Sequence, residues 1–125
     1  LVSHLGKIQL TIVIIAPPEQ VEEGERIFKS HDLWMRATHY KGGDKALVSY
    51  SVSKGPELVD PLDTNSEQTG RTCFILTEVY ESEAGVADHY HQAFNNWQEF
   101  PAFRQWLNNC QSTVIPAASI IKSLW

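Results

Sequence analysis

The chain has 125 residues, enough for one domain that buries roughly two-thirds of the surface its unfolded chain exposes. Its composition, 42% apolar and 20% charged, is that of an ordinary globular protein and excludes an intrinsically disordered chain. The net charge of −5, with ten Lys and Arg scattered along the chain, excludes the basic footprint of a nucleic-acid-binding protein.

Membrane and secreted classes are not indicated either. The longest apolar run, residues 10–16, is far shorter than the ~20 residues that span a bilayer. Cys73 and Cys110 do not make the dense disulfide framework of a small secreted domain, and no basic segment followed by an apolar stretch opens the chain as a secretory signal would. We therefore expect a cytoplasmic protein with reduced thiols and no membrane partner.

The first third of the chain predicts a strand followed by a long helix. Residues 8–15 form a β-branched run that ends at Pro17 and Pro18, as a central, two-sided strand does. A proline suits the first turn of a helix because that turn needs no amide hydrogen, so a helix is expected over residues 18–38. Its core-facing stripe, spaced by three and four, is Val21, Gly24, Ile27, Phe28, His31, Trp34 and Met35.

The middle of the chain predicts two strands joined by a long irregular segment. Residues 46–53 alternate, with Val48 and Tyr50 on one face and serines on the other. Residues 72–80 are the third expected strand. The segment between them, residues 54–70, is rich in Gly, Pro and Asp and is either a functional lid or a plain connection.

The last third predicts two helical segments and a final strand. Ser82 is a good N-cap for a helix that should end near Gln98. Pro101 cannot continue that helix and instead starts a second, short one. Residues 112–125 form the last strand, which Pro116 restricts to an edge or bulged position.

The resulting βαββαβ order predicts an α+β, ferredoxin-like fold over a single domain, residues 1–125. In this fold an antiparallel sheet carries its helices on one face and leaves the other face bare. Because the first and third strands are apolar on both sides, the bare face should be covered. A twofold contact between two copies is the common solution, so we expect a homodimer through the open sheet face.

One segment carries a family resemblance. Residues 76–89, LTEVYESEAGVADH, combine a strand that ends in Glu-x-Tyr, a short acidic turn, an alanine and a histidine inside the next helix. The pattern resembles the antibiotic-biosynthesis-monooxygenase-like family of dimeric α+β barrels, in which two ferredoxin-like protomers press their open sheet faces together. Its positions fall here on Glu78, Tyr80, Glu83, Ala84 and His89.

The resemblance implies a cleft for a small molecule. The family includes cofactor-free oxygenases of polycyclic aromatics, haem degraders and lactone isomerases, so it does not single out one reaction. The first half of this chain departs from the usual family pattern, because it has a longer first helix that carries His31, Trp34, Met35 and His39 and then a long segment after the second strand.

The HYH sequence at residues 89–91 contains one candidate site residue. Two positions apart on a helix are about 200° apart around its axis, so His89 and His91 cannot bind one metal ion. His89 lies beside the core stripe, where it either lines a cleft or is a hydrogen-bonded core residue. His91 should face water.

The first helix presents a second group on one face. His31, Met35 and His39 are four residues apart in succession, and Trp34 is their neighbour through the i, i+3 relation. They form either a pocket wall, with a histidine as general base and Trp34 beside a planar substrate, or a plain helix in which His39 caps the end and His31 is partly exposed.

The strands contribute a carboxyl group and two phenols. Glu78 lies in an apolar strand and faces a polar cavity, pairs with a histidine or Arg104, or is exposed at an edge; burial would raise its pKa. Tyr50 and Tyr80 are either hydrogen-bond donors to a substrate oxyanion or core aromatics with a hydrated hydroxyl.

The chain contains no Gly-rich phosphate loop, no zinc-type Cys and His spacing and no nucleophile elbow, so neither a nucleotide nor a metal site is expected. The hypothesis is a homodimeric, cofactor-independent monooxygenase- or isomerase-like enzyme for a small hydrophobic, oxygenated or aromatic compound. Alternatives are a non-catalytic ligand-binding or sensing module and a haem-binding protein. The candidate catalytic residues are His89, Glu78, His31 and His39, and the candidate ligand-binding residues are Trp34, Tyr50, Tyr80 and Trp97.

Overall fold

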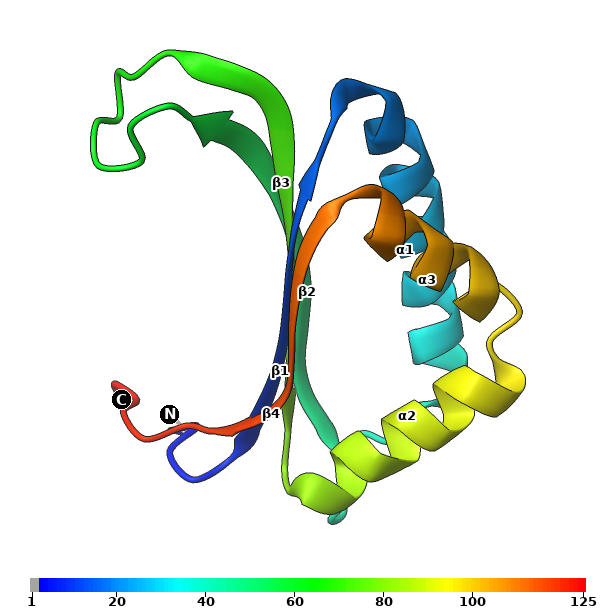
Figure 1. The fold of residues 1–125 in the computed structure, drawn as a ribbon. Helices are drawn as coiled ribbons and strands as arrows, with labels where there is room; N and C mark the ends of the chain where they lie inside the picture. The colour runs from blue at the N-terminus through cyan, green and yellow to red at the C-terminus, as the bar shows by residue number, and fades with distance from the viewer. Residues whose placement is uncertain (1–2) are drawn as a thin grey trace.

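The computed structural model describes residues 3–125, which form a four-stranded antiparallel sheet with three α-helices on one face (Figure 1). The strand order is β2-β3-β1-β4, and the chain runs βαββααβ, which confirms the predicted ferredoxin-like α+β fold. The elements are β1 (Ile8–Ala16), a 3₁₀ turn (Pro18–Gln20), α1 (Val21–Thr38), β2 (Leu47–Leu58), β3 (Gln68–Tyr80), α2 (Glu83–Asn96), α3 (Phe100–Asn109) and β4 (Gln111–Ser119). Within residues 3–125, none of these helices has both the length and the hydropathy needed to cross a membrane.

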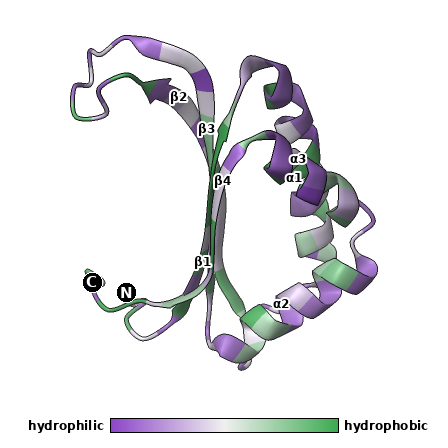
Figure 2. Cartoon of the chain, in the orientation of Figure 1, coloured by the Kyte–Doolittle hydropathy of each residue, from purple (hydrophilic) through white to green (hydrophobic). Residues whose placement is uncertain are grey.

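The hydrophobic core lies between the sheet and the helices. Every second residue of β1 is buried there, because side chains alternate between the two faces of a strand. The indole of Trp106 on α3 packs edge-on against the rings of Phe28 and Phe74, so α3 is joined to both α1 and β3. Figure 2 shows the hydrophobic residues along β1 in the middle of the sheet and hydrophilic ones along much of α3.

The expected irregular segment at residues 54–70 is shorter than its sequence indicates. β2 continues to Leu58 and β3 begins at Gln68, so only residues 59–67 lie outside the strands. Gly55 and Pro56 predict the end of the strand, but β2 is an edge strand, where a proline is tolerated because one side of the strand needs no amide donors. The far end of this hairpin bends away from the helices, so it does not form a lid over the core side of the sheet (Figure 1).

A β-bulge near the start of β2 corrects a second expectation. Leu47 pairs with Tyr80 and Ser49 with Val79, so two residue steps on β2 face one on β3. Leu47 therefore takes the place beside Tyr80 that the plain alternation assigns to Val48, and Val48 is 39% exposed. The bulge leaves Tyr50 opposite Glu78 on the helix-covered face.

The last strand is shorter than the sequence predicts. β4 ends at Ser119 rather than continuing to Trp125, and Pro116 lies where the register between β1 and β4 shifts. β4 is an edge strand, so the predicted edge or bulged position of Pro116 is confirmed.

The sheet face that points away from the helices is open and mixed in character. Its exposed apolar residues are Val13 at 37%, Ile75 at 39% and Ile115 at 47%. Threonines alternate with these residues along β1, β3 and β4, and Ser49, Ser51 and Ser53 make the β2 part of the face polar. The end of the β2–β3 hairpin and the segment after β4 both curve toward this side and make it concave (Figure 1).

Gly24 allows α1 and α3 to approach each other. A Cβ at this position would collide with the indole of Trp106. We therefore expect Gly24→Ala to destabilise the protein by about 1–3 kcal/mol, although alanine is the better helix former. Urea denaturation of wild type, Gly24→Ala and the control Gly42→Ala checks this, since a Cβ at Gly42 meets nothing within 4 Å. Equal stability of the two variants would show that Trp106 moves aside without cost.

Candidate functional site

The candidate site lies between the sheet and helices α1 and α2, and the fold brings all eight predicted site residues into it. His31, Trp34 and His39 come from α1 and its C-cap, and His89 from α2. The rings of Trp34 and Trp97 stack with centroids 5.6 Å apart, and the ring of His31 lies 4.9 Å from that of Trp97. Tyr50, Glu78 and Tyr80 complete the set from β2 and β3.

Glu78 is the centre of this cluster. Its side chain is 0% exposed and lies on the inner face of β3, as the strand alternation requires. Oε1 accepts a hydrogen bond of 2.5 Å from the Tyr80 hydroxyl, whereas Oε2 is buried without a hydrogen-bond partner. Burial raises the pKa of Glu78 to about 7, and the hydrogen bond from Tyr80 only partly opposes this effect.

The ionisable side chains nearest to Glu78 are histidines. His31 Nε2 lies 3.9 Å from Oε2, and His89 Nδ1 lies 3.7 Å from Oε1. The sequence predicts either a histidine or Arg104 as the partner of Glu78. Within residues 3–125 Glu78 lies beside two histidines and forms no ion pair with Arg104.

The histidines of the cluster are neutral at pH 7. Burial lowers the pKa of both His31 and His89 to about 3, and it lowers the pKa of His39 as well. His31 is 5% exposed, which overturns the alternative of a partly exposed side chain. His39 does lie at the C-cap of α1, but its ring turns inward to His89. His91 is exposed, as predicted.

A chain of hydrogen bonds fixes which nitrogen of His89 carries the proton. Thr38 donates its hydroxyl hydrogen to the carbonyl oxygen of Trp34 (2.7 Å), so its oxygen accepts from His39 Nδ1 (2.9 Å). His39 Nε2 is then an acceptor, and His89 Nδ1 donates to it (2.8 Å). The remaining nitrogen of neutral His89, Nε2, therefore keeps a free lone pair.

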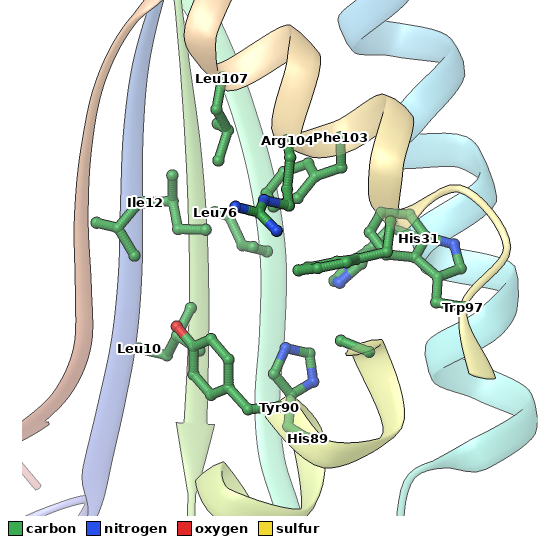
Figure 3. Close-up of a pocket in the computed structure, with 13 residues that line it drawn as sticks. Leu10, Ile12, His31, Leu76, His89, Tyr90, Trp97, Phe103, Arg104 and Leu107 are labelled. Atoms are coloured by element: carbon green, nitrogen blue, oxygen red, sulfur yellow. The ribbon is translucent and has the colours of Figure 1, made fainter. Parts of the chain in front are cut away.

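An apolar cavity of about 140 Å³ adjoins the histidines (Figure 3). His89 from α2 and Arg104 from α3 both extend into it. Within residues 3–125 the guanidinium of Arg104 forms no salt bridge and lies 5.9 Å from the ring centroid of Phe100. The other lining residues are mostly aliphatic and aromatic: Leu10, Ile12, His31, Leu76, Tyr90, Ala93, Trp97, Phe100, Phe103, Leu107 and Val114.

The sequence reasoning missed the contribution of α3 to this cavity. Phe100, Phe103, Arg104 and Leu107 all line it, and their spacing of three and four residues is the signal of one helix face. Because the segment was assigned only as a short helix after Pro101, that face was not connected with the histidines.

A separate groove of about 280 Å³ lies on the other side of the cluster, and His39 and Tyr50 both line it. His39 is hydrogen-bonded to His89, and Tyr50 is hydrogen-bonded to His31 Nδ1 (2.8 Å). Each pair therefore joins a residue at the groove to a residue at the inner cavity.

Comparison with known proteins supports the fold. No protein-family profile matches the sequence, and a search of curated proteins found no match. The structure resembles that of a dimeric ferredoxin-like protein from an uncultured marine organism, with a TM-score of 0.63 over 94% of this chain and 98% of that one. The two sequences are 12% identical. This likeness establishes the ferredoxin-like fold alone.

The raised pKa of Glu78 predicts a pH-dependent stability difference. Unfolded Glu78 loses its proton near 4.5 and the folded residue near 7, so its stabilising contribution is complete below pH 4.5 and is lost as the pH rises through 7. Glu78→Gln removes this dependence. Its stability relative to wild type should rise by up to about 3 kcal/mol between pH 4.5 and 8, at 1.36 kcal/mol per pKa unit.

Denaturant unfolding at several pH values measures this difference. Glu57→Gln is the matched control, because the hydrogen bond from Thr69, with Arg71 adding to it, lowers the pKa of Glu57. Its stability relative to wild type should fall as the pH rises toward 4.5 and stay constant between pH 4.5 and 8. A Glu78→Gln difference that stays constant with pH would show that Glu78 titrates as it does in the unfolded chain.

Proposed function

We propose that this protein is a homodimeric enzyme that binds one compact, apolar, oxygenated molecule in the inner cavity and transfers a proton from it. The observation that carries the proposal is Glu78, a carboxyl group with a pKa of about 7 that is buried behind two neutral histidines at the wall of that cavity. A proton acceptor works best when its pKa lies near the operating pH.

The cavity volume limits the size of the substrate. An engineered apolar cavity of about 150 Å³ in another protein holds one benzene molecule. A volume of about 140 Å³ therefore fits a single ring, and neither a polycyclic aromatic nor a haem. Arg104 supplies a cation at the wall, which favours a substrate whose oxygen becomes negative when the proton leaves.

The proton acceptor in contact with the substrate is His89. His89 lines the cavity, and its Nε2 carries the free lone pair. Glu78, by contrast, has no exposed surface. Protonation at Nε2 makes an imidazolium whose Nδ1 lies 3.7 Å from Glu78 Oε1. Distances of this kind shorten in substrate complexes, so Glu78 first stabilises the imidazolium and then stores the proton.

His39 completes the route to solvent. It is hydrogen-bonded to His89 and lines the outer groove, so a proton that leaves the cavity through His89 reaches water at this groove. His31 is the second imidazole beside Glu78, and Tyr50 holds it in place by a hydrogen bond. It helps to stabilise the charge of the Glu78 carboxylate.

Removal of a proton is a first step suited to cofactor-independent monooxygenases and to lactone-type isomerases, two of the three activities that the resemblance at residues 76–89 implies. Both need a carbanion or an oxyanion to form in a site that excludes water. The aromatic wall of the cavity meets this need, which supports an enzyme over a passive binding module.

The dimer is supported by the open sheet face and by the structural neighbour. The exposed apolar residues of β1, β3 and β4 lie on one concave surface, and the neighbour is described as dimeric. An isologous contact would cover this surface and leave the helix-covered cavity of each protomer intact.

A filled cavity should abolish ligand binding. Ala93 is buried in α2 and lines the cavity, so Ala93→Leu should occupy the space of a ring and weaken the binding of cyclic ketones and phenols at least tenfold. Ala87→Leu, on the exposed side of the same helix, is the control and should bind as wild type. Ligand-detected NMR measures both, and unchanged binding in Ala93→Leu would place the ligand elsewhere.

The same compounds test proton transfer. Wild type should speed the exchange of the acidic C–H of a bound cyclic ketone with deuterium in D₂O, and His89→Gln and Glu78→Gln should reduce this by about 100-fold while binding is retained. His91→Gln, two positions along α2, should exchange as wild type. Binding without accelerated exchange in wild type would indicate the non-catalytic module instead.

The oligomeric state is tested by sedimentation at micromolar concentration. Val13→Lys places a charge in the middle of the open sheet face and should convert the dimer to a monomer. Leu33→Lys, at an exposed position of α1, should remain dimeric. A monomeric wild type would contradict the assembly.

A further inference from the structure

Three side chains with metal-binding atoms converge at the wall of the inner cavity. His31, Glu78 and His89 each offer one ligand atom, and these atoms all lie within 4.8 Å of one another. The three residues come from α1, β3 and α2, and each side chain is almost completely buried. The spacing of these residues does not predict a metal site, because they lie 47 and 11 positions apart and match no short motif.

The Glu78 carboxylate has an unused oxygen inside this group. Oε1 is occupied by the Tyr80 hydroxyl, but Oε2 is buried and makes no hydrogen bond. An unpartnered buried oxygen is costly, and proteins rarely keep one without a reason such as an ion or a water at the site. The atom nearest to Oε2 among the histidine nitrogens is His31 Nε2, at 3.9 Å.

One nitrogen of each histidine ring is already held by a hydrogen bond. Tyr50 binds Nδ1 of His31, and His39 binds Nδ1 of His89, each at 2.8 Å. The Nε2 atom of each ring is therefore the one left to coordinate. Metal-ligating histidines typically have their second nitrogen fixed in this way, which sets the tautomer and the ring orientation.

We infer that His31, Glu78 and His89 bind one divalent transition-metal ion. Two imidazoles and one carboxylate suit ions such as Zn²⁺, Co²⁺ or Fe²⁺, whereas Mg²⁺ and Ca²⁺ prefer six or more oxygens. Zinc bonds of about 2.0–2.2 Å place neighbouring donors about 3 to 4 Å apart. The separation of 3.9 Å between His31 Nε2 and Glu78 Oε2 lies within this range, and one ligand atom from each of the three residues lies within 4.8 Å of the other two.

This inference goes beyond the proposed function. A bound ion occupies the lone pair of His89, which is the proton acceptor of the proposed route, and keeps the Glu78 carboxylate charged and coordinated. The metal-bound chain therefore loses that route, and the coordination positions that the protein does not fill are directed toward the cavity, because His31 and His89 both line it. A divalent ion thus inhibits the proton transfer proposed above.

Binding of Co²⁺ and Zn²⁺ to the metal-free chain tests the site without any organic ligand. We expect one Co²⁺ per chain with visible d–d absorption, and displacement of Co²⁺ by Zn²⁺. Glu78→Gln and His89→Gln should each weaken the affinity at least 100-fold, and His39→Ala, which removes the outer partner of His89, about 10-fold. His91→Gln is the matched surface control and should bind as wild type.

Histidine NMR of the wild type gives a second readout that does not depend on any variant folding. Co²⁺ should broaden or shift the ring signals of His31 and His89 before that of His91. Absence of stoichiometric binding, equal binding by His91→Gln, Glu78→Gln and His89→Gln, or effects confined to His91 would overturn the inference. The deuterium-exchange experiment tests proton transfer and does not depend on these results. The metal site and the proposed function can therefore be disproved independently.

Discussion

Glu78 lies on the inner face of β3 with no exposed surface, and the groups around it are arranged as that burial requires. A carboxyl group without water needs a hydrogen-bond donor, and Tyr80, two residues along the same strand face, supplies it. The negative charge of the buried carboxylate must be balanced by a nearby positive charge or neutralised by a proton. The nearest groups are two imidazoles that are themselves too buried to be charged, so Glu78 gains and loses its proton near neutral pH.

The rest of the site depends on this arrangement. The bulge in β2 leaves Tyr50 opposite Glu78, where its hydroxyl binds His31. The end of α1 brings Thr38 and His39 to His89 and so sets the His89 tautomer. The aromatic residues of α3 line the cavity beside the imidazoles. The candidate site therefore lies on the helix-covered face of the sheet, and the opposite face is open.

Much of this could be predicted from the sequence. The strand β1, the helix α1 and the junction of β3 with α2 have clear periodicities, and these three elements place His31, Glu78 and His89 on inward positions. The separation of His89 from His91 followed from helix geometry alone. The family pattern at residues 76–89 also predicts the ferredoxin-like fold.

The parts that could not be predicted depend on tertiary contacts. The local sequence predicts that the strand ends at Pro56, but β2 continues through it because an edge strand tolerates a proline. The bulge at Val48 changes the face of Leu47 without any glycine to mark it. The hydrogen bond between His39 and His89 joins residues 50 positions apart, so neither the tautomer nor the three-residue ligand group was visible in the spacing.

The protonation of Glu78 is the central claim, and a ¹³C NMR titration of the glutamate side-chain carboxyl groups measures it directly. The signal that disappears in Glu78→Gln should titrate with a midpoint of about 7, well above the ordinary value of 4.5. A Glu78 signal that titrates near 4.5 would contradict the account, because the buried carboxyl group would then be charged throughout the neutral range.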